Sequence, residues 1–137
     1  MTGIDDWSGK TVLIVGGSGG MGRATAQEFA DAGANLAIAD INTENLPPQF
    51  FAIKCDITKV SDCAEMISKT VTRFGRLDLL VNAAGVWVEG DTSAMSEAQW
   101  DRTIDINLKG TFFTCRHAIP ELEKPVAKLL TLPRTLA

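Results

Sequence analysis

The fold of this chain is decided by the stretch Thr11-Val-Leu-Ile-Val-Gly-Gly-Ser-Gly-Gly-Met-Gly22. Its first five residues are apolar or β-branched, which is typical of a strand buried on both faces of a parallel sheet. A glycine-rich turn follows at once. Residues 23–32 then have helical spacing, with Ala26 and Phe29 on one side. A strand, a glycine turn and a helix in this order predict the first half of a βαβ unit.

The glycines of this turn have a spacing that suits a bound phosphate. Gly16, Gly20 and Gly22 let the backbone turn sharply and come close to a pyrophosphate, while the N-terminus of the next helix offers free N–H groups and a partial positive charge. A nucleotide-triphosphate P-loop would need Lys and then Ser or Thr where this chain has Arg23 and Ala24. The motif therefore favours a dinucleotide and excludes an NTPase.

The rest of the chain repeats the alternation of strands and helices. We expect strands over residues 36–39, 50–55 and 77–81, a short loop over residues 42–49, a helix over residues 59–74, and a long helix over residues 96–119 that starts at a Ser96–Gln99 capping box. This order predicts an α/β fold, a Rossmann-like parallel sheet with helices on both faces and about four or five strands. We expect residues 1–124 to form the dinucleotide-binding domain and residues 125–137 to be an aberrant tail, with a possible fifth strand.

The polar and glycine-rich features fall where the predicted strands end. They are Gly16–Gly22, Asp40, Asp56 and Asn82–Gly85. Ligands of open parallel sheets bind outside the carboxyl ends of the strands, so this shared location predicts a ligand site. Asp40 follows the second strand, where a carboxylate accepts hydrogen bonds from the adenosine ribose and repels a 2′-phosphate. No Lys or Arg follows in residues 41–43, and we therefore expect NAD rather than NADP.

Composition and charge narrow the classes of function. The chain has 137 residues, 45% of them apolar and 22% charged, and a net charge of −4 without a basic cluster, which argues against nucleic acid as a partner. We expect no secretory leader, no membrane span and no membrane partner. The three cysteines are scattered and contain no CxxC pair, so we expect a reducing, cytoplasmic setting and no metal site.

Four motifs in this order resemble the short-chain dehydrogenase/reductase family over about residues 8–124. Val15–Gly22 resembles its Thr-Gly-x-x-x-Gly-x-Gly motif, with Val15 in place of Thr. The segment at Asp56 resembles the family's adenine-flanking segment, and Asn82-Ala-Ala-Gly85 resembles its Asn-Asn-Ala-Gly motif. The long helix, with Asn107, resembles the helix that carries the family's catalytic Asn.

The resemblance implies a role for each matching position. Gly16, Ser18, Gly20, Met21 and Gly22 are expected at the cofactor phosphates and adjacent ribose, Asp40 at the adenosine ribose, Asp56 and Ile57 beside the adenine, and Asn82, Ala83 and Gly85 beside the nicotinamide ribose. Asn107 is implied as a catalytic residue that organises the water of a proton relay. In the full-length family the reaction is hydride transfer between an alcohol or carbonyl substrate and the nicotinamide.

The chain contains no tyrosine, although the family's proton donor is a Tyr with a Lys beside it. We therefore expect this truncated chain to be inactive alone. The tail supports a specific cause: regrouping the bases of its possible codons by one position allows Ala-Gly-Gly-Lys-Ile-Val-Asn-Ile-Ala-Ser, the type of strand that the family has here. We hypothesise a one-base frameshift just before Pro125; a genuine short form with its own C-terminus is the alternative.

The long helix raises a second class of function. Without further sheet to cover it, part of its apolar face over residues 96–119 would be exposed, which predicts self-association. A non-enzymatic interaction module that pairs with a full-length relative, and a non-functional product of a broken gene, therefore stand beside the leading hypothesis of an NAD-binding oxidoreductase chain.

Overall fold

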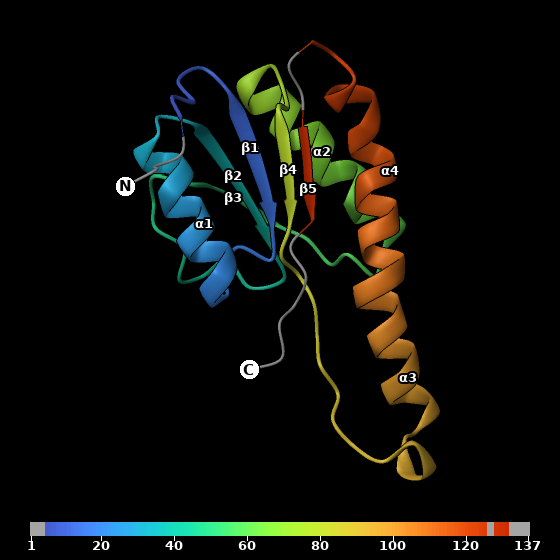
Figure 1. Cartoon of the computed structure of the whole chain (residues 1–137). Coiled ribbons are helices and arrows are strands. Elements are labelled where there is room, and N and C mark those ends of the chain that lie inside the picture. Colours follow the sequence, from blue (N-terminus) through green and yellow to red (C-terminus); the bar gives the residue numbers. More distant parts are fainter. Residues whose placement is uncertain (1–4, 126–127, 132–137) are drawn as a thin grey trace.

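The backbone forms a parallel sheet with helices on both faces, as the sequence predicts. A computed structural model describes residues 5–125 and 128–131. The strands are β1 (Thr11–Val15), β2 (Asn35–Asp40), β3 (Phe51–Lys54), β4 (Leu79–Asn82) and β5 (Lys128–Thr131), and they lie in the order β3-β2-β1-β4-β5, all pairs parallel (Figure 1). The helices are α1 (Gly20–Asp31), α2 (Val60–Phe74), α3 (Glu97–Ile104) and α4 (Thr111–Leu122), with short turns η1 (Thr92–Ala94) and η2 (Asp105–Gly110).

The order of the strands places the ligand site. From β1 through β2 to β3, the chain steps outward from the centre of the sheet to one edge, and β4 then returns to the other side of β1. Such a reversal separates the loops that follow β1 and β4, and it is the position where open α/β sheets bind their ligands. The register pairs Val15 with both Ala39 and Asn82, so these three strands end at nearly the same level.

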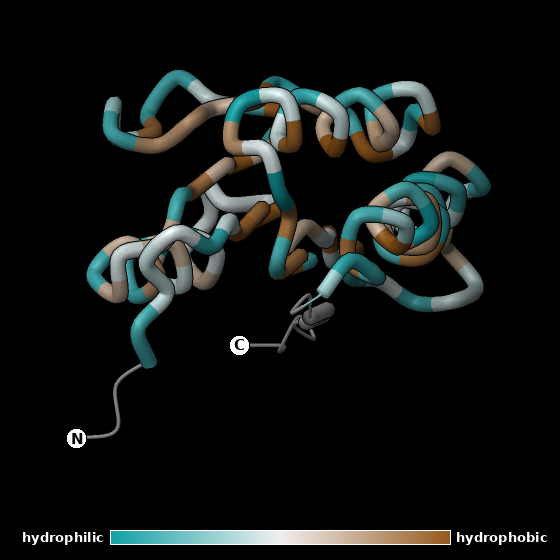
Figure 2. The backbone as a smooth tube through the Cα atoms, turned by 90° about the horizontal axis from the view of Figure 1, so that it is seen from above, coloured by the Kyte–Doolittle hydropathy of each residue, from teal (hydrophilic) through white to brown (hydrophobic). Residues whose placement is uncertain are grey.

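The core lies on both faces of the sheet. On one face α1 packs through Ala26 and Phe29 against Val12 and Ile14 of β1. On the other face, α2 and α4 pack against the sheet. Figure 2 shows the sheet between the layers of helices, with hydrophobic positions along its strands. Each residue of β1 is at most 2% exposed, because both of its faces and both of its edges are covered.

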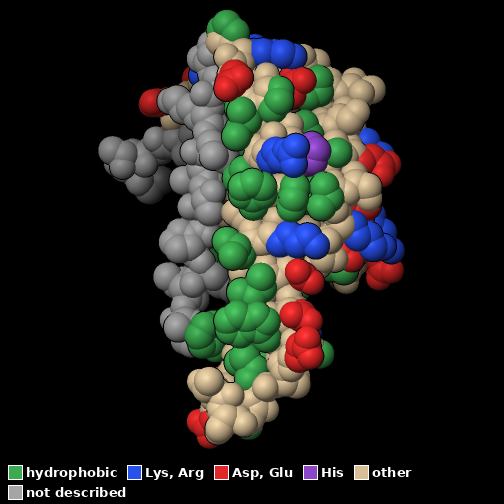
Figure 3. Space-filling model, turned by 90° about the vertical axis from the view of Figure 1, so that its right-hand side faces the viewer, with side chains coloured by type: hydrophobic (Ala, Val, Ile, Leu, Met, Phe, Trp, Pro, Cys, Tyr) green, Lys and Arg blue, Asp and Glu red, His purple; other side chains and the backbone are tan. Residues whose placement is uncertain are grey.

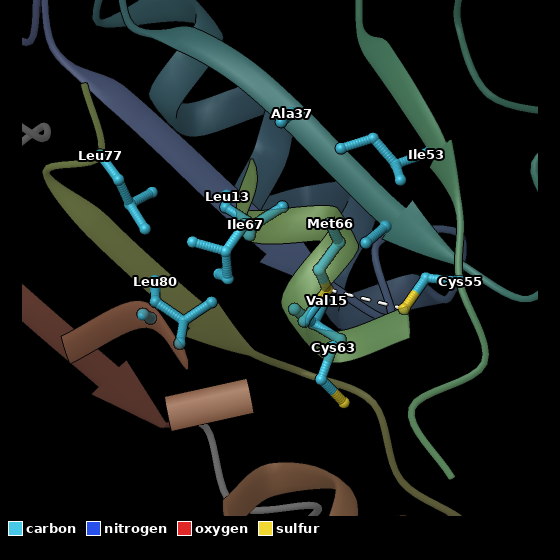
Figure 4. Close-up of a cluster of buried hydrophobic side chains, with 12 residues drawn as sticks. Leu13, Val15, Ala37, Ile53, Cys55, Cys63, Met66, Ile67, Leu77 and Leu80 are labelled. Carbon is cyan, nitrogen blue, oxygen red and sulfur yellow. Dashed lines mark hydrogen bonds between the residues drawn. The ribbon is translucent and has the colours of Figure 1, made fainter. Parts of the chain in front are cut away.

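Sulfur-bearing side chains fill part of the core beneath α2. Met66 and Cys63 of α2 belong to the cluster that includes Leu13 and Leu80 of the sheet, and the Cys55 thiol lies 3.6 Å from the Met66 sulfur (Figure 4). Burial is the largest cause that raises the pKa of Cys55, to about 12. This thiol therefore stays protonated at neutral pH and acts as a small apolar side chain.

Two predicted boundaries differ from the structure. Helix α1 starts at Gly20, three residues before its predicted start, because Gly22 packs on the backbone of Gly16 and the glycine turn winds into the helix. Strand β4 starts at Leu79 instead of Leu77, since the Asp78 carboxylate already accepts a hydrogen bond from the Thr11 N–H. Packing against neighbours decides both ends, whereas propensity alone disfavours glycine in a helix.

The long helix also differs from its prediction. The capping box of Ser96 and Gln99 is present, but α3 and α4 are joined by η2, a π-helical turn, and α4 continues past Pro120 to Leu122. Single π-helical turns are rare and are frequently found at functional sites. Among the described residues no helix is both long and apolar enough to cross a membrane.

Candidate functional site

A cavity of about 610 Å³ opens at the carboxyl ends of β1, β2, β3 and β4. This volume lies within the range of small-molecule and cofactor sites. Ten predicted cofactor-binding residues line it: Gly16, Ser18, Gly20, Met21, Gly22, Asp40, Asp56, Ile57, Ala83 and Gly85. The prediction from four separate motifs thus converges on one surface, and the ligand role of each residue stays a prediction.

The floor of the cavity is a close contact between two turns. Gly16 has φ +82°, a conformation that L side chains rarely adopt, and a Cβ on it would overlap the backbone of Ala84. A Cβ on Gly22 would overlap the carbonyl oxygen of Gly16. Backbone rather than side chain therefore forms this floor, which leaves the space that a diphosphate needs beside the start of α1.

The start of α1 has no side-chain cap. Gly19 stands at the N-cap position and the first turn holds no acidic residue. The N–H groups of the first turn therefore keep their capacity to bind an anion, and the helix dipole adds to it. Arg23 does not contribute here, because its guanidinium donates to the carbonyl oxygen of Asn45.

Asp40 is held in place by three hydrogen bonds. The Ser18 N–H and hydroxyl donate to one carboxylate oxygen at 3.0 and 2.6 Å, and the Asn42 N–H donates to the other at 3.0 Å. A carboxylate offers about four acceptor sites. One site remains open, and a second opens if the Ser18 hydroxyl rotates away, so a ribose diol and this carboxylate are chemically matched.

Asp56 and Ile57 form the next side of the cavity, after β3. The Asp56 carboxylate accepts from the Thr58 hydroxyl at 2.7 Å and from the Thr58 N–H at 3.0 Å. The hydroxyl bond is the largest cause that lowers the pKa of Asp56. Ile57 lies against Gly110 of η2, where a Cβ would overlap its side chain. The loop after β3 is thereby tied to the long helix.

Two predicted site residues point elsewhere. Asn82 is 4% exposed and does not line the cavity; its amide nitrogen donates to the Cys115 thiol at 3.4 Å, beneath the turn. Asn107 also stands outside the lining residues. Its amide oxygen accepts from the Val86 N–H and its amide nitrogen donates to the Val86 carbonyl, both at 2.8 Å. This paired bond fixes the loop after β4 against η2, a contact that the sequence did not reveal.

Sequence reasoning missed a wall of the cavity. Ile106 and Arg102 line it from η2 and α3, and their spacing of four residues is that of one helical turn. This spacing could have identified them once Asn107 was placed at the site. Within the described residues no three His, Cys, Asp or Glu side chains gather closely enough to hold a metal ion.

A glycine turn at a helix start, a carboxylate after the second strand and a cavity at the switch in strand order are features of the class of dinucleotide-binding α/β proteins. The sequence profile of the short chain dehydrogenase family matches residues 10–129. The chain therefore belongs to the short-chain dehydrogenase/reductase family of oxidoreductases, which use a nicotinamide cofactor.

Individual relatives agree with this assignment. An uncharacterized oxidoreductase of Thermotoga maritima is 36% identical over 129 residues, which cover 87% of this chain and 51% of the relative. The ligand-free aldohexose dehydrogenase of Thermoplasma acidophilum superposes with a TM-score of 0.84 at 30% identity, over 93% of this chain and 49% of that one. A structure described as an NADH-dependent reductase responsible for alginate metabolism gives 0.83 at 27% identity, over 90% and 58%. The chain spans about half the length of the curated relatives that it matches.

The pKa of Asp56 leads to a prediction about stability. Its folded pKa lies below the unfolded value, so its stabilising effect is complete above about pH 4 and is lost as the pH falls through the lowered folded pKa. Thr58→Val removes the hydroxyl whose hydrogen bond is the largest cause of the lowered pKa of Asp56. The difference in free energy of unfolding between wild type and this variant should shrink on acidification, as measured by urea unfolding across pH.

Thr25→Val is the matched control, because the Thr25 hydroxyl donates to the Met21 carbonyl, which does not titrate in this range. Its effect on stability should be independent of pH. An equal pH dependence of both variants would contradict the role assigned to Thr58.

Proposed function

We propose that the cavity binds NAD, with Asp40 as the residue that selects it over NADP. The observation that carries the proposal is the Asp40 carboxylate, which is fixed at the cavity by Ser18 and Asn42 and retains acceptor capacity. A ribose diol donates to such a group, whereas a 2′-phosphate meets like charge at the same place. One solved relative is described as NADH-dependent, which supports this direction.

The other predicted site residues would contact successive parts of the cofactor along the cavity. The backbone of Gly16, Gly20, Met21 and Gly22 would hold the diphosphate at the start of α1, and Ser18 would lie between the phosphates and the ribose. Asp56 and Ile57 would flank the adenine, while Ala83 and Gly85 would contact the nicotinamide ribose. Asn82 would act beneath this turn through its bond to Cys115. The bound nicotinamide would supply the hydride chemistry of the family.

Asn107 is proposed as a positioning residue for this site. Both polar atoms of its amide bind the Val86 backbone, so the side chain sets the path of the loop that leaves the cavity. In the full-length family an Asn in this helix organises a proton relay, and we propose that Asn107 contributes to that relay only in a chain that also carries the Tyr and Lys.

Substitution of Asp40 tests the selectivity for NAD. Asp40→Asn should weaken NADH binding about 10- to 100-fold, because a hydrogen bond to a charged acceptor is replaced by one to a neutral group, and it should reduce the preference of wild type for NADH over NADPH. Isothermal titration calorimetry measures both. Asp31→Asn removes a carboxylate from the exposed end of α1 and should leave binding unchanged.

Wild type that binds NADPH as tightly as NADH would overturn the assignment to NAD. Wild type that binds neither, with normal circular dichroism, would overturn cofactor binding altogether.

We further propose that these 137 residues do not turn over substrate by themselves. The sequence contains no tyrosine, and general acid–base catalysis contributes about 10²–10⁴-fold in rate. Purified protein of verified sequence should show no oxidation of NADH above the uncatalysed rate with a panel of small aldehydes and ketones. Turnover that follows the protein through purification would contradict this. We propose a cytoplasmic location for the protein, and an alcohol or carbonyl substrate only for a form that also carries the Tyr and Lys of the family.

The reading frame of the tail is a related hypothesis. Residues 125–137 allow, in the displaced frame, the strand sequence that the family carries after this helix. The described part of the tail does form a strand, β5, beside β4. The nucleotide sequence after codon 124 decides the matter: a displaced frame that closes quickly, or lacks a downstream Tyr-x-x-x-Lys, contradicts the frameshift.

A second candidate function, association through the long helix, is favoured by its exposed side chains. Trp100, Leu108, Phe112 and Ile119 are 58%, 64%, 60% and 44% exposed. They lie on α3, η2 and α4, along a face where Figure 3 shows a band of apolar side chains that is interrupted by basic ones. A band of this kind marks an interaction surface. The partner would be a second copy of the chain or a full-length relative.

Introduction of a charged side chain into this band provides the test. Phe112→Glu should convert a self-associated chain into a monomer, because a carboxylate cannot be buried in an apolar interface without a large cost. Sedimentation velocity measures the change. Val60→Glu, at an exposed apolar position on α2, should keep the association of wild type. Wild type that sediments as a monomer at every concentration would exclude self-association and leave only the relative as a partner.

A further inference from the structure

Arg102 is the only basic side chain among the described residues that line the cavity. It projects from α3, on the far side of the cavity from the glycine turn, while the acidic lining residues are Asp40 and Asp56. A guanidinium in this position is not explained by the predicted diphosphate site, which uses backbone N–H groups at the start of α1.

The guanidinium of Arg102 has no hydrogen-bond or ion-pair partner within residues 5–125 and 128–131. The other described arginines are engaged: Arg23 binds the Asn45 carbonyl, Arg73 lies over Phe51 and Phe74, Arg76 pairs with Asp78, and Arg116 lies over Phe113. Arg102 therefore differs from them in lining the cavity with its N–H donors unpaired among the described residues.

The surroundings of Arg102 suit a flat aromatic base. Ile106 stands one helical turn away on the same wall, and Ile57 reaches the neighbouring Gly110 from the loop after β3. Two branched apolar side chains thus border the space next to Asp56. A guanidinium is planar and weakly hydrated, and it stacks on aromatic faces better than an ammonium does.

We propose that Arg102 is an adenine-binding residue, whose guanidinium stacks on the base and closes the side of the cavity formed by Ile57 and Ile106. The proposal rests on the nucleotide binding proposed above. It assigns the outer half of the long helix a part in ligand binding, because α3 would carry a contact that no residue of the glycine turn can make.

Binding of adenine compounds of increasing charge tests the contact. Calorimetric titrations of wild type, Arg102→Ala and Arg102→Lys with adenosine, AMP and NADH are compared at low and high salt. Arg102→Ala should weaken all three by a similar factor, about three- to tenfold, because the lost contact is with the base that they share. Arg102→Lys should recover little of the lost affinity, since lysine keeps the positive charge but lacks the planar guanidinium.

Lys109→Ala is the matched control. Lys109 lies on η2, is exposed and does not line the cavity, so its removal changes the charge of the same helix without touching the base site. Its titrations should equal those of wild type. Thermal unfolding of each variant checks that the fold is retained.

Other outcomes overturn the assignment. A loss confined to AMP and NADH, restored by lysine and removed by high salt, would make Arg102 a phosphate contact instead; equal affinities of wild type and Arg102→Ala would remove it from the site. Wild type that binds AMP but not NADH would refute the proposed NAD function while still testing Arg102. Wild type that binds no adenine compound would refute both.

Discussion

The structure depends on one steric constraint, the approach of the glycine turn after β1 to the turn after β4. Gly16 lies so close to Ala84 that no side chain fits between them, and Gly22 lies as close to Gly16. These two contacts bring the start of α1, the end of β1 and the end of β4 into one place. The cavity exists because its floor is backbone, and its remaining walls are built outward from that floor.

The amide of Asn107 makes a second structural connection, because it binds both the N–H and the carbonyl of Val86. It joins the loop after β4 to η2, and the contact of Ile57 with Gly110 joins the loop after β3 to the same turn. The π-helical geometry of η2 thus coincides with the place where two loops of the site are anchored. The helix beyond it, α3, is thereby held over the cavity instead of over the sheet.

The electrostatics of the site follow from these positions. Two carboxylates, Asp40 and Asp56, line the cavity, and each already accepts hydrogen bonds from a neighbouring hydroxyl and N–H. The uncapped start of α1 and the guanidinium of Arg102 supply the positive potential. A dinucleotide matches this pattern along its length, with hydroxyls for the carboxylates and phosphates for the helix start.

The sequence by itself determined the parallel sheet, the glycine turn and ten of the residues around the cavity, because period, glycine spacing and strand-end position are local properties of the chain. It also determined that the chain has no tyrosine. Tertiary structure alone decided that Asn82 and Asn107 turn away from the cavity toward Cys115 and Val86, and that Arg102 and Ile106 turn into it. Those directions depend on where α3 and η2 pack against loops that are far away in sequence. The four-residue spacing of Arg102 and Ile106 places them on one side of a helix, but it does not say which side faces the cavity.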